Sequence, residues 1–168
     1  PELQRAFSVS ANHDEPLDPM SHEPPPSAVP RTRVALSDDA RATLNDLARR
    51  AYPHEACGLL VGRRRDHVAR ADEVTQSRNL EISRAHDRYT LDPVHLLEVE
   101  TDANRRGLEV LGVWHTHPDH PARPSETDRE GAWEGWSYVI VSVVDGAAHD
   151  LRSWTLVEGD FVEEEVTS

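Results

Sequence analysis

The sequence predicts a mixed α/β domain built around one central β-sheet. Two segments carry apolar residues at helical spacing behind favourable N-cap residues. Short apolar segments, typical of buried strands, lie between these helices and after them. The inferred order of elements is α-β-β-α-β-α-β-β-β, without internal repeats. Helices and strands that alternate in this way favour a single sheet covered by helices.

Each of the two longer helices is predicted from its ends. The segment 37–51 begins with Ser37, a favourable N-cap, and ends with arginines in its last turn. The segment 92–106 begins with Asp92 and Pro93, which suit the N-cap and the first helical position. A third, short helix is expected over 125–134.

Strands are expected where apolar runs are bounded by turn residues. Residues 63–66 are predicted to form a turn, 75–86 an irregular segment and 117–124 a proline-rich loop. The predicted strands are 57–62, 67–74, 108–114, 138–144, 151–157 and 161–166.

The composition divides the 168 residues into two parts. Residues 1–33 contain 7 of the 12 prolines and few aliphatic residues. Such a segment cannot bury enough apolar surface to offset the entropy of ordering, so we expect a disordered tail. Residues 34–168 are long enough for one core and are expected to form the folded domain.

Charge and cysteine content exclude several classes of protein. The 18 basic residues, all arginine, and 31 acidic residues give a net charge of −13, which disfavours nucleic-acid binding. No apolar run reaches the ~18 residues of a membrane span, and no signal pattern is visible, so we expect a cytoplasmic protein without membrane contact. A single cysteine excludes an internal disulfide and a multi-cysteine zinc site.

The strongest indication of chemistry is the stretch HTHPDHPARPSETD at 115–128. His115 and His117 are two residues apart at a strand end, so both imidazoles project from the same face. Asp128 follows at the start of the short helix. Two histidines and one carboxylate are a common catalytic zinc set with an open fourth position. The alternative is that the histidines are ordinary surface residues and that Ser125 and Asp128 only cap the helix.

Glu55 is a second candidate, 60 residues before His115. A charged residue at the entrance to a buried strand is often only a corner residue. A hydrolytic zinc site, however, also needs a carboxylate that is not a ligand and can carry a proton from water to the leaving group. Glu55 suits that role.

These segments together resemble the JAMM, or MPN-plus, metallopeptidase family. Its signature is an upstream Glu followed by H-x-H-x7-S-x2-D, which Glu55, His115, His117, Ser125 and Asp128 match in full. The segment YPHEACGLLVG at 52–62 adds to the match, and the resemblance covers roughly 34–166.

The resemblance implies a cytidine-deaminase-like fold with a curved mixed β-sheet flanked by helices. It also implies one zinc ion per chain, held by His115, His117 and Asp128 with a water as fourth ligand. Glu55 would be the general acid and base, and Ser125 would stabilise the developing oxyanion. The H-x-E and P-C-x-x-C motifs of the deaminases are absent, which argues against deamination.

Within the family, the chain resembles the short bacterial peptidases that release cysteine from a sulfur-carrier protein. The implied partner is a small ubiquitin-like or sulfur carrier that ends in Gly-Gly, with cleavage of a peptide or isopeptide bond after the last glycine. Two alternatives stay open: a non-catalytic MPN scaffold that binds protein partners, and a RadC-like protein associated with DNA repair. The oligomeric state is left open.

Other chemically capable residues are expected to be structural. Cys57 lacks the histidine partner of a nucleophile, so a buried core position is expected. Trp114 faces away from His115 in a regular strand and is assigned to packing. His120 is expected to be a solvated loop residue, and Trp133 and Trp136 ordinary core or surface aromatics.

Overall fold

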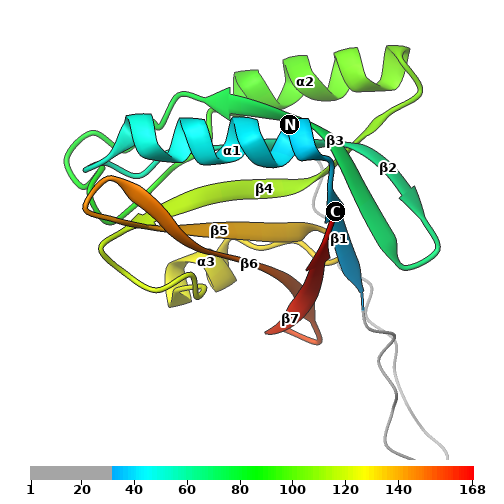
Figure 1. Cartoon of the computed structure of the whole chain (residues 1–168). Helices are drawn as coiled ribbons and strands as arrows, with labels where there is room; N and C mark the ends of the chain where they lie inside the picture. Colours follow the sequence, from blue (N-terminus) through cyan, green and yellow to red (C-terminus); the bar gives the residue numbers. More distant parts are fainter. Residues whose placement is uncertain (1–31) are drawn as a thin grey trace, which may run out of the picture.

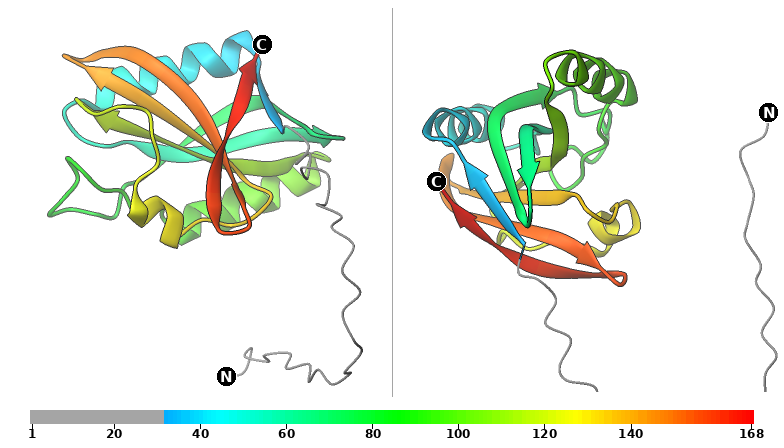
Figure 2. Two further views of the ribbon diagram at one scale, coloured as in Figure 1. Left: turned by 90° about the horizontal axis from the view of Figure 1, so that it is seen from below. Right: turned by 90° about the vertical axis from the view of Figure 1, so that its right-hand side faces the viewer.

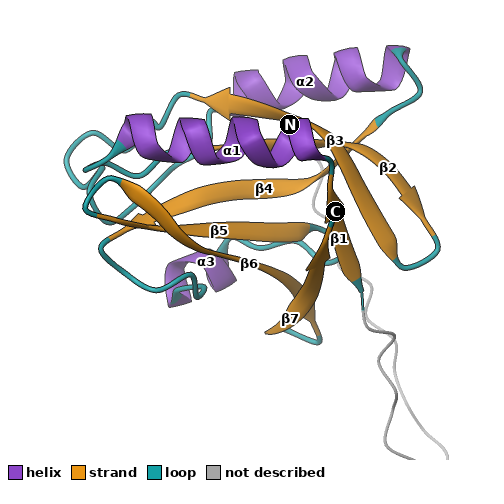
Figure 3. Ribbon diagram, viewed as in Figure 1, coloured by secondary structure: helices purple, strands orange, loops and turns teal. Residues whose placement is uncertain are grey.

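The computed structural model describes residues 32–168 and confirms a mixed α/β fold (Figures 1 and 3). The disordered tail expected over 1–33 falls on residues that, apart from Thr32 and Arg33, lie outside those described. None of the helices in the described part is long and apolar enough to cross a membrane. The elements are, in chain order, β1 (Arg33–Leu36), α1 (Asp38–Ala51), β2 (Cys57–Arg65), β3 (Val68–Ser77), α2 (Pro93–Arg105), β4 (Glu109–Pro118), α3 (Glu126–Glu130), β5 (Ser137–Val144), β6 (Ala147–Val157) and β7 (Asp160–Thr167).

The strands form one mixed sheet that curves until it closes on itself. The order is β1-β3-β2-β4-β5-β6-β7, with β4 and β5 parallel and β2 antiparallel to both β3 and β4. The four-residue strand β1 closes the sheet, because it pairs in parallel with both β3 and β7. The sequence pattern missed β1, since four residues next to a proline-rich segment show no usable period.

The two longer helices cover opposite faces of the curved sheet (Figure 2, right). Neighbouring residues of β4 identify the two faces: Trp114 packs in the core beneath α1, whereas Val113 packs in the smaller cluster beneath α2. Leu44 of α1 and Leu96 of α2 belong to these two clusters. His115 has the same parity as Val113, so it lies on the α2 side of the sheet.

Some predicted boundaries were wrong. The expected turn at 63–66 is strand up to Arg65, because these residues pair with the start of β3 and only Asp66 and His67 turn the chain. Asp66 adopts a φ of 52°, a conformation that Asp tolerates in tight turns. The strand predicted over 108–114 continues to Pro118, and the short helix ends at Glu130, where Gly131 caps it.

Candidate metal centre and catalytic site

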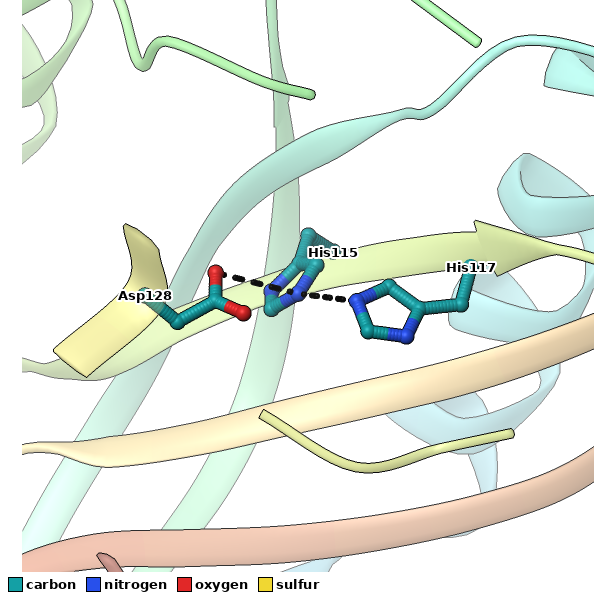
Figure 4. Close-up of side chains that lie close together, drawn as sticks. All are labelled: His115, His117 and Asp128. Carbon is teal, nitrogen blue, oxygen red and sulfur yellow. Dashed lines mark hydrogen bonds and ion pairs between the residues drawn. The ribbon is translucent and has the colours of Figure 1, made fainter. Parts of the chain in front are cut away.

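Strand β4 brings the two histidines of the motif together, with a ring nitrogen of each pointing toward the other (Figure 4). His115 is 1% exposed, and its Nε2 lies 3.1 Å from Nε2 of His117. The intervening Thr116 is fully buried on the other side of the strand. The i, i+2 spacing therefore places both imidazoles on one spot, as the sequence predicted.

Helix α3 presents Asp128 to the same spot. Ser125 is its N-cap, and the capping arrangement that the sequence left open as an alternative is present beside the metal-site geometry: Asp128 N donates to Ser125 Oγ at 3.1 Å. One oxygen of Asp128, Oδ2, accepts from the backbone N of Ser125 at 2.6 Å and from its hydroxyl at 2.7 Å. The other oxygen, Oδ1, lies 3.5 Å from His115 Nε2. Capping thus aims Oδ1 at the histidines.

The donor set fits a tetrahedral zinc ion. One ligand atom from each of the three residues lies within 4.8 Å of the others, and no other such group occurs in residues 32–168. Ligands about 2.0–2.2 Å from zinc in a tetrahedron are roughly 3.3–3.5 Å apart. The two pairs that include His115 Nε2 are 3.1 Å and 3.5 Å apart, and the pair of His117 and Asp128 lies within 4.8 Å.

Both imidazoles are held in orientations that suit ligation. His117 Nδ1 lies 2.8 Å from the carbonyl oxygen of Pro121, to which it donates when Nε2 carries the free electron pair. The ring of His115 stacks on Tyr89 with centroids 4.4 Å apart. Burial, partly opposed by the charge of Asp128, lowers the pKa of His115 to about 4, so the ring is neutral at pH 7.

Pairing of β2 with β4 brings Glu55 to the cleft despite its distance in sequence. Cys57 lies opposite His115 in the register, and Ala56 and Thr116 exchange hydrogen bonds. Glu55 is 8% exposed and lines the cleft together with His117 and Asp128. Burial, followed by the negative charge of Asp128, raises the pKa of Glu55 to about 8. A bound cation would lower this pKa again.

A cleft of about 750 Å³ opens above these residues on the α2 side of the sheet. Ser125 lines it, although its hydroxyl is donated to Asp128. The other residues that line it come from α2, α3, strands β4 and β5 and the adjoining loops: Asp87, Arg88, Tyr89, Thr90, Leu91, Pro93, Leu96, Val113, His120, Pro121, Arg123, Thr127, Gly131, Trp133, Trp136 and Tyr138.

The residues expected to be structural divide into two groups. Cys57 is buried, its pKa is raised to about 12 chiefly by burial, and Trp114 is fully buried with its indole N–H donated to Thr75 O, so both predictions are confirmed. His120 is an exposed loop residue, as expected, but it lies at the cleft. Trp133 and Trp136 also line the cleft, a placement that the sequence did not predict.

Sequence reasoning missed Tyr89 and the carbonyl of Pro121. Tyr89 lies between the predicted irregular segment 75–86 and the helix predicted from Asp92, where no motif indicates a functional residue. It contacts His115 only in the folded chain. Pro121 belongs to the predicted proline-rich loop, which could have indicated a rigid support but not which carbonyl His117 would find.

Comparison with known proteins agrees with the geometry. Residues 37–157 match the family of prokaryotic homologs of the JAB domain. The chain is 35% identical to the CysO-cysteine peptidase of Mycobacterium tuberculosis, over 71% of this chain and 80% of the relative. It is also 35% identical to a probable TtuB-protein conjugate cleaving protease of Thermus thermophilus, over 80% and 78% of the two chains.

A solved structure supports the same assignment. The solution structure of protein DSY2949 from Desulfitobacterium hafniense has a TM-score of 0.69 and 31% identity, covering 79% of this chain and 90% of that one. A match over most of the described domain, together with relatives of this identity, shows common descent and a common fold. The chain belongs to the family of prokaryotic homologs of the JAB domain.

Proposed function

We propose that this chain is a zinc-dependent hydrolase that cleaves the bond after the C-terminal glycine of a ubiquitin-like or sulfur-carrier protein. The observation that carries the proposal is the convergence of His115, His117 and Asp128 at a cleft that Glu55 also lines. These three residues would hold one zinc ion per chain and leave a fourth position for water. When bound, zinc would lower the pKa of that water and polarise the substrate carbonyl.

The side chains of this chain would move and hold the protons. Glu55 accepts a proton from the attacking water and returns it to the departing amine, which requires an ionised carboxylate in the resting site. Ser125 keeps Asp128 aimed at the histidines through its hydroxyl. The same hydroxyl would donate to the developing oxyanion, for which it must leave Oδ2 of Asp128.

The substrate class is supported by the names of the relatives. One is a CysO-cysteine peptidase and another a probable protease of TtuB-protein conjugates, so a carrier-protein conjugate is the common element. A Gly-Gly end suits such a substrate, because residues without side chains permit close approach of the scissile carbonyl to buried groups such as His115. The cytoplasmic location stays a prediction.

The two alternative functions are less well supported. A non-catalytic scaffold does not need the complete ligand set with an adjacent buried carboxylate, which this chain has. A DNA-associated function is disfavoured by the net charge of −13. Zinc content after purification and a salt-dependent DNA shift assay test the two alternatives separately.

The test of the proposal is intact-protein mass spectrometry of a carrier that ends in Gly-Gly and is extended by cysteine or another amine. Incubation with the zinc-loaded chain should remove only the mass of the amine. Replacement of the last glycine by valine should abolish cleavage, because the side chain would occupy the space next to the scissile carbonyl. Equal cleavage of the valine variant, or of unrelated peptides, would overturn the carrier assignment.

A further inference from the structure

Two arginines that line the cleft lack a charged partner. Most arginines in residues 32–168 are held by acidic side chains, such as Arg106 by Glu73, or by carbonyl oxygens, such as Arg64 by Leu111 and Gly135. Four have neither kind of contact among the described residues, and two of these line the cleft. They are Arg65, Arg88, Arg105 and Arg123, of which Arg88 and Arg123 line it.

The backbone at Arg123 is fixed although its side chain is exposed. The preceding residue, Ala122, is fully buried and accepts a hydrogen bond from Trp154 Nε1 at 3.2 Å. The carbonyl of His120 accepts one from Ser142 Oγ at 2.7 Å. A cationic side chain thus projects from an anchored loop, two residues before Ser125 and at most about 7.6 Å from it between Cα atoms.

Arg88 lies next to Tyr89, whose ring stacks on His115. The backbone here is also held, because Asn79 Nδ2 donates to the carbonyl of Arg88 at 3.0 Å. Two acidic groups are near Arg88, but both have other partners: Asp87 pairs with Arg84, and Glu81 accepts from Ser83 and Arg84. Neither forms an ion pair with Arg88, so the guanidinium remains available to a ligand.

A free guanidinium in a cleft is suited to a carboxylate, because its planar donors match the two oxygens. When a carrier adduct is cleaved after its last glycine, a free carboxylate close to the scissile bond can come only from the leaving group. If the leaving amine is an amino acid joined through its α-nitrogen, its carboxylate carbon lies two bonds from the scissile nitrogen. In a lysine isopeptide, the scissile nitrogen is followed by an uncharged four-carbon chain.

We propose that Arg123, assisted by Arg88, binds the free α-carboxylate of a single amino acid attached to the carrier. This inference rests on the proposed function and deepens it, since it assigns the side chains that would recognise the leaving group. The chain would act as a carboxypeptidase on carrier–amino acid adducts and would discriminate against lysine isopeptides. Arg123 is the principal residue, because it forms no ion pair within residues 32–168 and follows the anchored Ala122, whereas Arg88 has Asp87 and Glu81 nearby.

The experiment compares three adducts of one Gly-Gly carrier: a C-terminal amino acid, the same amino acid as its amide, and an isopeptide to the side chain of an internal lysine. We expect the zinc-loaded wild type to favour the free acid over the other two by about 10-fold or more in kcat/KM, as a charge-assisted hydrogen bond would give. In R123Q the ratio of kcat/KM for the acid to that for the amide should fall towards one, mainly because KM for the acid rises. R123K should recover part of the ratio, and R88Q should lower it less.

The matched control is R65Q, which removes another exposed arginine that has no ion-pair partner within residues 32–168 and does not line the cleft. It should keep the wild-type ratio of acid to amide. If R65Q lowers the ratio as much as R123Q, the effect is one of overall charge and the assignment is wrong. An unchanged ratio in R123Q, or an isopeptide cleaved as fast as the free acid by the wild type, would also overturn it.

Binding measured without turnover separates this inference from the proposed function. In an E55Q background, calorimetry should show tighter binding of the acid adduct than of the amide, and R123Q should remove the difference. If the wild type cleaves none of the adducts but the difference in binding is found, the proposed hydrolase is wrong and the carboxylate site is supported. If cleavage occurs without a difference in binding, the hydrolase is supported and the carboxylate site is wrong.

Discussion

The base of the cleft and its walls are built in different ways. The base consists of the start of β2 and the end of β4, where Glu55 and His115 are buried and the β4 backbone is hydrogen-bonded on both sides. The walls consist of 87–91, the start of α2, 119–125, α3 and the segment 131–136 that follows it, where Arg123 and Trp133 are exposed.

This difference indicates that the base and the walls of the cleft serve different functions. Groups that must keep a fixed geometry come from sheet residues or, for Asp128, from a helix end fixed by a capping box. The groups proposed to contact the leaving amino acid come from loops, where sequence can change without disturbing the sheet. Substitutions at the base should therefore affect metal and turnover, and substitutions in the walls should affect the choice of substrate.

The largest effect is expected from loss of the ligand set. The purified protein should contain about one zinc ion per chain, and His115→Ala, His117→Ala or Asp128→Ala should each lose most of it, because two remaining ligands bind weakly. Metal analysis by mass spectrometry checks this. Full occupancy in a His115→Ala, His117→Ala double variant would show that the metal site lies elsewhere.

Glu55→Gln should have the next largest effect, on turnover rather than on the binding of zinc or carrier. The substitution keeps the size of the side chain but removes the base, so zinc and carrier binding should remain while turnover falls by about 10²-fold or more. Single-turnover assays on the carrier adduct, with zinc content measured in parallel, separate the two. Near-normal turnover would mean that another residue carries the proton.

Ser125→Ala tests the point where base and wall meet. Loss of the hydrogen bond to Asp128 Oδ2 should weaken zinc binding by about 10-fold, since groups that orient ligands have effects of this size. At saturating zinc, the turnover of the variant should still be about 10²-fold below that of the wild type if the hydroxyl also donates a hydrogen bond to the oxyanion. Complete recovery at saturating zinc would limit Ser125 to positioning Asp128.

The smallest effect concerns stability without metal. In the metal-free protein the pKa of Glu55 is raised to about 8 from an ordinary 4.5, so the folded state binds more protons than the unfolded state between these values. Stability must therefore fall as pH rises through this range. Glu55→Gln should remove that loss, and its melting temperature should exceed that of the wild type by roughly 5 °C at pH 8.5 but not at pH 4.5.

Glu126→Gln in α3 is the matched control for this measurement. Glu126 is exposed, and its hydrogen bond with Arg129 lowers its pKa. Any contribution of Glu126 to folding stability is therefore present at high pH and is lost as pH falls, opposite to the effect of Glu55. Calorimetric scans of both variants from pH 4.5 to 8.5 give the comparison. The same pH dependence in both variants would contradict a special environment for Glu55. Added zinc should reduce the advantage of Glu55→Gln, because a cation favours the ionised carboxylate.

Local features of the site could be predicted from the sequence. The alternation of side chains along a strand placed His115 and His117 on one face, and the capping preference of Ser125 fixed Asp128 in the first turn of α3. Both follow from interactions within a few residues, which leave a readable pattern. Family resemblance then assigned a role to Glu55, which spacing alone could not do.

Contacts between distant segments were decided only by the tertiary structure. The β2–β4 register that sets Cys57 opposite His115, the closure of the sheet through β1, and the stacking of Tyr89 on His115 all join residues far apart in the chain. The same holds for the place of Arg123 in the cleft. Such contacts have no local period or propensity, because their stability comes from burial and pairing that exist only after the whole sheet has closed.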